Sequence, residues 1–345
     1  MAALTGTPVG VGTPGARIVA LDVLRGVALC GILVINIYQQ LVWVRGTGER
    51  TLPLAVQLIF FERFLTIFAL LFGVGFGLFL TRAAARTPRP RVVLVRRLVA
   101  LAAIGALHQF VHQGEVLLPY ALVGLAVLLP LSVAGRWECL VIGVAAVLVL
   151  PQIEESFGLI VGLLILGFAL ARVGVAEHLT DRPGRVAVVG AVAGALTVAW
   201  VVLALTGARL PRVNLVGGGL GGTQDLLPSL AAVATAITLC CAVLLLLHTP
   251  VGPVLTDVFA PMGRMALTNY LAATVLFLAL GPLLGIDSTA DAPAIAALTV
   301  GILVVQIVWS RLWLRAFTHG PVEWGWRCVT WGRRAPLRRG AAGAT

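Results

Sequence analysis

Long apolar runs recur along this chain, and most of them are long enough to cross the ~30 Å hydrocarbon core of a bilayer as α-helices. Only 11% of the 345 residues are charged, whereas a soluble domain has about 25%, and the mean hydropathy is +1.02. Lipid leaves backbone polar groups no partner, so apolar spans form helices or closed barrels. The alternating segments of about ten residues that mark a barrel are absent. The sequence therefore predicts an all-α, polytopic integral membrane protein.

We expect about ten transmembrane helices within a membrane domain at 18–316. A flexible cytoplasmic N-terminus (1–17) precedes it, and a cytoplasmic aromatic and basic tail (317–345) follows it. The predicted spans are 19–42, 56–80, 98–115, 117–134, 138–153, 157–172, 186–206, 228–248, 265–284 and 293–314.

The basic residues predict the orientation of these spans. The net charge is +11, and all 25 basic residues are arginine. A basic chain could bind nucleic acid, but these arginines cluster in short loops between apolar runs, as topology determinants do. With ten spans and both termini in the cytoplasm, nineteen arginines lie on the inner side, four on the outer side and two within helices. An odd number of spans would spoil this asymmetry.

Several other features predict no cofactor chemistry. The five cysteines lie in or beside apolar segments without zinc-ligand spacing, so neither a metal site nor a disulfide framework is expected. The glycine-rich segment 207–227 contains GGGLGG but lacks the GK[ST] ending of a phosphate loop, which favours a flexible outer loop.

The stretch RRLVALAAIGALHQFVHQGEVLLPYAL, from Arg96 to Leu122, carries the strongest functional signal. On one continuous helix, Arg97, His108, His112 and Glu115 would lie within ~60° of one another. Ionisable groups in a membrane are costly, so they face the protein interior and mark functional sites. This stretch is therefore the candidate active centre.

His108, Glu115 and His112 are the candidate catalytic residues. A histidine supported by a carboxylate can act as a general base. Structural hydrogen bonding is an alternative, and two histidines four apart could also bind a metal if a third ligand came from elsewhere. His108 is the stronger candidate because it lies deeper, and we expect His112 to be solvated near the outer surface. Glu115 would lie ~10 Å from His108 along such a helix, too far for direct contact.

Two other helices contribute candidate binding residues. In the first, Asp22, Arg25, Asn36 and Gln40 share one face within ~60°, which favours a polar cavity or partner helix over a mere interfacial ion pair. Asn269 is a polar residue in the inner half of the ninth. We expect the polar faces of the first and third helices to turn toward a shared cavity, because lipid would penalise either face.

Five segments resemble the YeiB-like bacterial membrane proteins, a family defined by a domain of unknown function (418). They are LDVLRGVALCGILVIN, FERFLTIFALLFGVGFGL, the Arg96–Leu122 stretch, GRMALTNYL and HGPVEWGWRCVTWGR, in that order over nearly the whole chain. The resemblance implies a multi-pass protein of the bacterial inner (plasma) membrane.

The first helices of that family are similar to those of the transmembrane acyltransferase superfamily, which includes the lysosomal heparan glucosaminide acetyltransferase. These enzymes move an acyl group from cytoplasmic acyl-CoA to a sugar across the membrane. By resemblance, His108 matches the histidine of an LLH motif, and Glu115 matches an acidic position where aspartate is usual.

The resemblance therefore implies an acyltransferase of the cell envelope. Acyl-CoA would be the donor, a glycan or lipid hydroxyl would be the acceptor, and Asp22, Arg25, Asn36, Arg97 and Asn269 would bind substrate. A proton-coupled transporter that uses His108 and Glu115 is the main alternative, and a non-catalytic membrane scaffold is a third. No nucleic-acid partner is expected, and an oligomer is possible.

Overall fold

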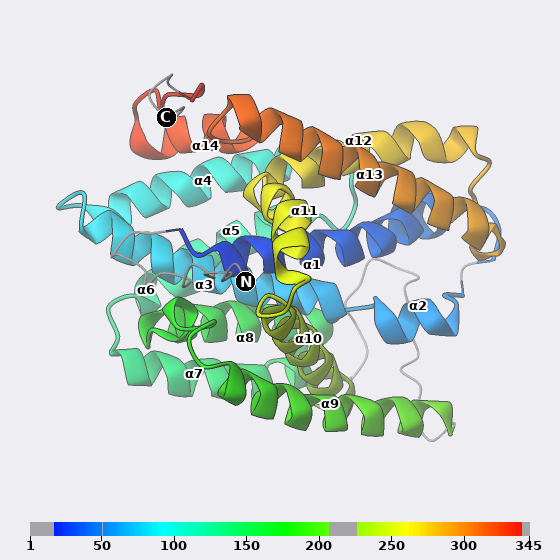
Figure 1. Ribbon diagram of the computed structural model, residues 1–345, viewed down its shortest axis with the longest axis horizontal. Coiled ribbons are helices and arrows are strands. Elements are labelled where there is room, and N and C mark those ends of the chain that lie inside the picture. The colour runs from blue at the N-terminus through cyan, green and yellow to red at the C-terminus, as the bar shows by residue number, and fades with distance from the viewer. Residues whose placement is uncertain (1–16, 50, 207–225, 340–345) are drawn as a thin grey trace, which may run out of the picture.

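The computed structural model describes residues 17–49, 51–206 and 226–339, and in these residues the fold is built from helices (Figure 1). The only β-type pairing among them is an isolated bridge between Phe317 and Arg338. Most of the predicted loop 207–227 and of the N-terminal segment 1–17 lies outside the described residues. The all-α prediction is confirmed.

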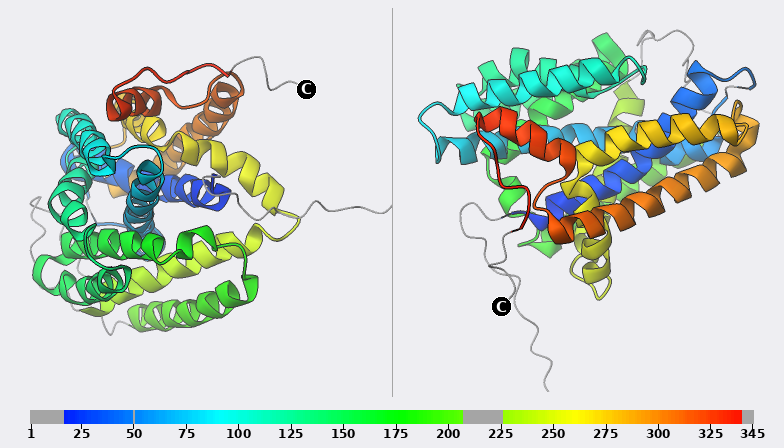
Figure 2. Two further views of the ribbon diagram at one scale, coloured as in Figure 1. Left: turned by 90° about the vertical axis from the view of Figure 1, so that its left-hand side faces the viewer. Right: turned by 90° about the horizontal axis from the view of Figure 1, so that it is seen from above.

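The helices lie mostly along one axis and form a bundle (Figures 1 and 2). In chain order they are α1 (Val19–Ile37), which continues into the π-helix η1 (Tyr38–Val44), α2 (Leu54–Ile59), α3 (Arg63–Ala84), α4 (Pro90–His108), α5 (Leu117–Val123), η2 (Gly124–Leu128), α6 (Leu129–Leu131), α7 (Arg136–Val149), α8 (Pro151–Arg172), η3 (Val175–Glu177), α9 (Pro183–Leu205), α10 (Leu226–Leu246), α11 (Gly252–Arg264), α12 (Ala266–Leu283), η4 (Thr289–Asp291), α13 (Ala292–Ala316) and α14 (Pro321–Trp331).

Among the described residues, seven helices are long and apolar enough to cross a membrane. They are Val19–Val44, Leu54–Ala84, Arg136–Glu154, Pro183–Leu205, Leu226–Leu246, Ala266–Leu283 and Thr289–Ala316. Two shorter apolar helices, Leu117–Leu131 and Phe157–Arg172, lie between them in sequence. With α4, which carries three arginines, these correspond to the ten predicted spans. The number ten and the orientation of the termini stay predictions.

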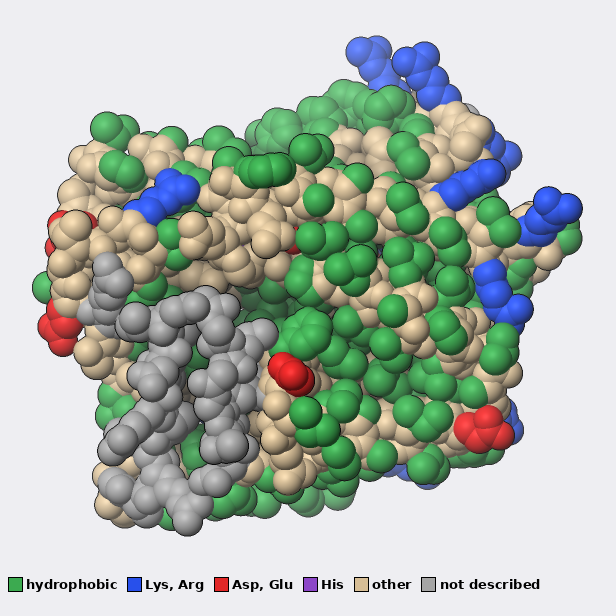
Figure 3. All heavy atoms as spheres, turned by 180° about the vertical axis from the view of Figure 1, so that it is seen from behind, with side chains coloured by type: hydrophobic (Ala, Val, Ile, Leu, Met, Phe, Trp, Pro, Cys, Tyr) green, Lys and Arg blue, Asp and Glu red, His purple; other side chains and the backbone are tan. Residues whose placement is uncertain are grey.

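The surface of the bundle is apolar where lipid would contact it. Along α9, exposed side chains such as Val188 and Leu196 are about 60% accessible, and α13 exposes Val300, Val304 and Val308 in the same way. Figure 3 shows a broad apolar face, with arginines gathered along its right-hand edge. The two ends of the bundle therefore differ in charge, and we call the end that carries these side chains the arginine-rich end.

The core has a tightly packed pair, α3 and α8, in which Phe76 meets Phe168 edge to face at 5.4 Å. On the other side, α1 packs against α11, α3 and α12. Helix α11 is amphipathic and too short to span a membrane, and it runs across the bundle axis in Figure 1. It connects the end of α10 to the start of α12.

The tail is part of the folded structure, since α14 packs against α4 and α12. Glu323 accepts hydrogen bonds from the backbone N–H and the hydroxyl of Thr268. Burial raises the pKa of this carboxyl above its ordinary value. Trp326 donates its indole N–H to the carbonyl of Arg97 at 2.7 Å. These contacts attach the tail to the arginine-rich end of the bundle.

Two predicted spans are interrupted. The expected helix at 98–115 was wrong at its end: α4 begins earlier, at Pro90, and stops at His108, and residues 109–116 form a turn. Gly114 has φ of +78°, a left-handed conformation that no α-helix contains and that glycine tolerates best. The second predicted span is likewise divided at 60–62 into α2 and α3.

Candidate functional site

The turn between α4 and α5, residues 109–116, organises the candidate site. Glu115 accepts hydrogen bonds from the backbone N–H groups of Leu117 and Leu118 and so caps the start of α5. A carboxylate at this position satisfies N–H groups that the first helical turn leaves unpaired and interacts favourably with the helix dipole. The chain therefore reverses direction with Glu115 facing inward, only 4% exposed.

The end of α1 holds the same turn from the side. Gln40 is fully buried in η1 and donates its amide to the carbonyl of Gln113 at 2.7 Å. Arg45 donates to the carbonyl of Val111 at 3.2 Å. The polar face predicted for the first helix thus ends against the turn. Helix α4 packs mainly against α5 and α14 and has few contacts with α1, so a cavity shared by the polar faces of the first and third helices stays a prediction.

His108 lies between a carboxylate and a hydroxyl. Its Nδ1 is 3.9 Å from Oε1 of Glu115, and its Nε2 is 3.1 Å from Oγ1 of Thr274 on α12. The first distance is longer than a hydrogen bond, so the carboxylate faces the imidazole without a direct hydrogen bond to it. The expectation that these two side chains lie too far apart for contact was wrong, because it assumed one continuous helix.

His112 is part of the same cluster and is only 1% exposed, so the expected solvated position was wrong. Its ring stacks on that of His108 with centroids 5.1 Å apart. Its Nδ1 lies 3.3 Å from Oγ1 of Thr274. One hydroxyl therefore lies within hydrogen-bond distance of both imidazoles, and Glu115, His108, Thr274 and His112 form a row of polar groups.

Helix α12 supplies the wall of the site that the sequence reasoning missed. Tyr270 lies edge-on to His108 with ring centroids 5.1 Å apart, and Phe277 lies edge-on to His112 at 6.1 Å. Tyr270 and Thr274 are four residues apart and share one helical face. The spacing of Tyr270 and Thr274 is a usable signal in the sequence, whereas the predicted binding residue on this helix is Asn269 alone.

Gly105, one turn before His108, lets the turn fold back closely. A Cβ atom at this position would lie 2.5 Å from the backbone nitrogen of Leu118 and 2.8 Å from Oε2 of Glu115. No ordinary side chain fits at such distances, so the absence of a side chain there brings Glu115 within reach of His108.

Three of the predicted binding residues form a second cluster, at the arginine-rich end. Asp22 pairs with Arg25 at 3.3 Å and also with Arg17. The guanidinium of Arg97 lies 3.5 Å over the Trp326 ring, and Arg25 is close enough to act on it electrostatically. At 1.5 Å per residue, Arg97 lies roughly 16 Å from His108 along α4. The two clusters are therefore separate.

Asn269 and Asn36 lie in neither cluster. Asn269 is 1% exposed, and its side-chain amide donates to the carbonyl of Met262 and the hydroxyl of Ser310. Its backbone carbonyl accepts a hydrogen bond from Gln306. It connects α11, α12 and α13, and its Oδ1 has no hydrogen-bond partner. Asn36 is half-buried near the end of α1. Binding roles for both stay predictions.

Within the described part of the chain, no group of three or more histidine, cysteine, aspartate or glutamate side chains is placed to hold a metal ion.

The bundle and its buried ionisable cluster define a polytopic helical membrane protein. The chain is 31% identical to a 39.9 kDa protein from the amylase 3′ region of Bacillus acidopullulyticus, over 93% of this chain and 96% of that protein. It is 28% identical to YeiB of Escherichia coli (strain K12), over 91% and 96% of the two chains, and 27% identical to YxaH of Bacillus subtilis (strain 168), over 94% and 96%.

Residues 170–333 match the family described as "Protein of unknown function (DUF418)". The chain belongs to this YeiB-like family. No solved structure matches it.

Proposed function

We propose that this protein is a membrane acyltransferase of the bacterial inner membrane, which moves an acyl group from cytoplasmic acyl-CoA to an acceptor hydroxyl on a glycan or lipid. The observation that carries the proposal is the Glu115–His108–Thr274 arrangement. A carboxylate lies at one ring nitrogen and a hydroxyl at the other. The same order of groups prepares a hydroxyl for attack in acyl-transfer enzymes.

In this mechanism, His108 is the general base. The acceptor hydroxyl approaches Nε2, in the direction that Thr274 now occupies, and gives up its proton as its oxygen attacks the thioester carbonyl. The C–S bond breaks, and the proton passes from His108 to the leaving CoA thiolate. Glu115 faces the transient imidazolium, and the N–H groups of Leu117 and Leu118 hold the carboxylate in position.

The arginine-rich end suits an acyl-CoA donor that comes from the cytoplasm. Arg25 and Arg97 are half-buried cations at this end of the bundle, and Asp22 pairs with Arg25. Their separation from His108 fits a donor with a charged end at the membrane surface and its thioester deeper in the bundle.

The test is acyl transfer by purified protein in proteoliposomes, measured as CoA thiol release and as label moved from radiolabelled acetyl-CoA to lipid or glycan. His108→Ala should remove activity by about 100-fold or more, the usual contribution of a general base. The control His178→Ala changes an exposed histidine paired with Asp181 and should leave activity unchanged. Full activity in His108→Ala would refute the site.

A proton-coupled transporter is the second candidate. The row from Glu115 through His108 and Thr274 to His112 favours it, because such chains of ionisable groups carry protons through membrane proteins. A pH-sensitive dye in the same proteoliposomes reports that activity. Solute-dependent proton flux that His108→Ala abolishes, without any turnover of acyl-CoA, would replace the acyltransferase proposal.

A further inference from the structure

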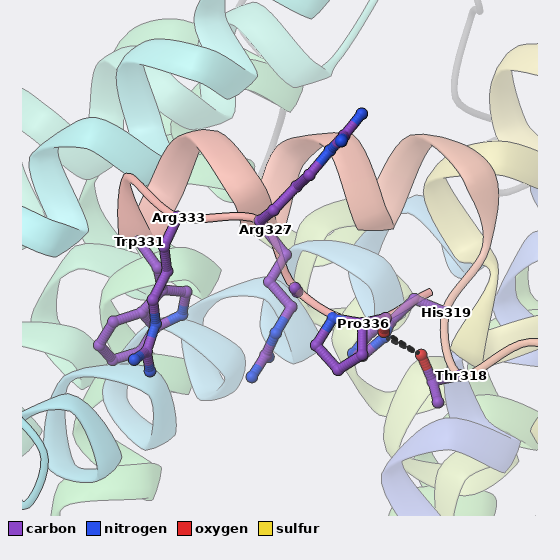
Figure 4. A pocket seen from close by; sticks show the side chains of 8 residues that line it. Thr318, His319, Arg327, Trp331, Arg333 and Pro336 are labelled. Atoms are coloured by element: carbon purple, nitrogen blue, oxygen red, sulfur yellow. Dashed lines mark hydrogen bonds between the residues drawn. The ribbon is translucent and has the colours of Figure 1, made fainter. Parts of the chain in front are cut away.

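The arginine-rich end contains a cavity that the proposed mechanism does not use. Its volume is about 320 Å³, at the lower end of the range for small-molecule sites. Figure 4 shows Trp331 and Arg333 at one end of the cavity, Thr318 and His319 at the other, and Arg327 between them.

The C-terminal segment forms one wall of the cavity and is held in place by hydrogen bonds. Thr318 donates its backbone N–H to Leu337 at 2.8 Å, and Arg339 donates its own to Ala316 at 3.0 Å. Trp324 donates its indole N–H to the carbonyl of Ala335 at 2.8 Å. The segment therefore returns from α14 to the end of α13 and closes the cavity on that side.

The lining is strongly basic. Arg327, Arg333 and Arg334 all contribute to it, and none of the lining residues, which all lie in the described part of the chain, is acidic. Burial, with Arg86 and Arg333 nearby, lowers the pKa of Arg327 below its ordinary value. Cations that crowd one another in a partly desolvated space are costly unless an anion joins them.

We propose that this cavity binds a phosphate group of an anionic ligand through Arg327, Arg333 and Arg334. Guanidinium groups match phosphate oxygens in pairs of parallel hydrogen bonds, and Trp331 offers an apolar face beside them. The proposal depends on the cavity alone, so it stands or falls separately from acyl transfer.

The phosphate could belong to a soluble molecule or to a phospholipid headgroup. For the soluble source, inorganic pyrophosphate is titrated into protein held in nanodiscs of neutral phosphatidylcholine, with calorimetry as the readout. For the lipid source, the nanodiscs contain phosphatidic acid, and native mass spectrometry measures the lipid that stays bound.

Arg327→Gln should weaken pyrophosphate binding or lipid retention by about tenfold, the effect of losing one charge-assisted contact. Arg334→Gln, at an exposed position, repeats the test with less risk to folding. Arg338→Gln removes the same charge from the same segment outside the cavity and should change binding less than about twofold. If only Arg327→Gln and Arg334→Gln weaken pyrophosphate binding, the ligand is a soluble molecule. If only these two variants weaken retention of phosphatidic acid, the ligand is a phospholipid.

Equal loss in all three variants would mean that bulk positive charge, and not the cavity, attracts the anion. Binding that none of the variants alters, or no binding in either arm, would equally overturn the proposal.

Discussion

His108 Nδ1 lies 3.9 Å from Glu115 Oε1 although the helix that carries His108 ends at that residue. The turn 109–116 brings the carboxylate back to the imidazole, and the capped start of α5 fixes it there. The geometry of the site therefore depends on a helix end and on a turn that is largely exposed but turns His112 and Glu115 into the interior.

His112→Ala should lower acyl transfer less than His108→Ala does. His112 lacks the carboxylate neighbour and contacts the row only through Thr274 and the ring of His108, so its loss changes the environment of the base and leaves the base in place. Turnover assays on equal amounts of the two variants provide the comparison, and thermal unfolding checks that both variants are folded. A larger loss in His112→Ala would move the role of general base to His112.

Glu115→Gln should reduce both activity and stability. Glutamine carries no charge to stabilise an imidazolium, and its amide presents one oxygen where two backbone N–H groups now donate. An unsatisfied buried N–H costs about 1–3 kcal/mol. The control is Glu138→Gln, which alters an exposed carboxylate that accepts from Gly135 and should leave turnover intact. Wild-type turnover in Glu115→Gln would show that the charge is not needed.

Gly105→Ala should lower the free energy of unfolding by about 1–3 kcal/mol, the typical cost of overpacking. It should also lower the turnover of protein that is still folded. The added methyl group would displace Glu115 or the start of α5. Gly301→Ala, in α13, is the matched control, because a Cβ atom there meets nothing within 4 Å. Thermal unfolding in detergent compares the two. Similar melting temperatures for both variants would contradict the close approach.

Reporter fusions should place the loop after α3 inside the cell and the loop after α12 outside. A phosphatase that is active only outside the cytoplasm, fused after Thr87, should be inactive, and fused after Asp287 it should be active. The arginine distribution motivates this expectation. The same result at both positions would reject the ten-span orientation.

Anion binding in the cavity should strengthen as the pH falls. Burial, followed by the charges of Arg327, Arg17 and Arg264, lowers the pKa of His319, so at neutral pH the free protein holds a neutral imidazole. A bound anion favours the imidazolium, so binding takes up a proton and tightens below the pKa of the bound state. Pyrophosphate also takes up a proton between about pH 8 and pH 6, so the measured quantity is the ratio of wild-type affinity to His319→Gln affinity, which should rise as the pH falls. A constant ratio would place His319 outside the anion's reach.

The apolar runs by themselves determined the all-helical membrane class, because their composition leaves lipid as the only suitable surroundings. The apolar runs also located most of the long helices, and the ionisable residues within one of them singled out His108, His112 and Glu115. A helical wheel could not predict where α4 ends, because it assumes one continuous helix through a segment in which Gly114 takes a left-handed conformation.

Only the tertiary structure decided which groups meet. Thr274 and Tyr270 lie more than 150 residues from His108 in sequence, and no periodicity within α4 predicts which face of α12 it contacts. Tertiary packing likewise placed Asn269 among three helices and Arg97 against Trp326. The hydrophobic pattern predicts the membrane spans because each span must present apolar side chains to lipid, and this requirement can be seen in the local sequence. Contacts between distant polar side chains depend instead on how the helices pack together.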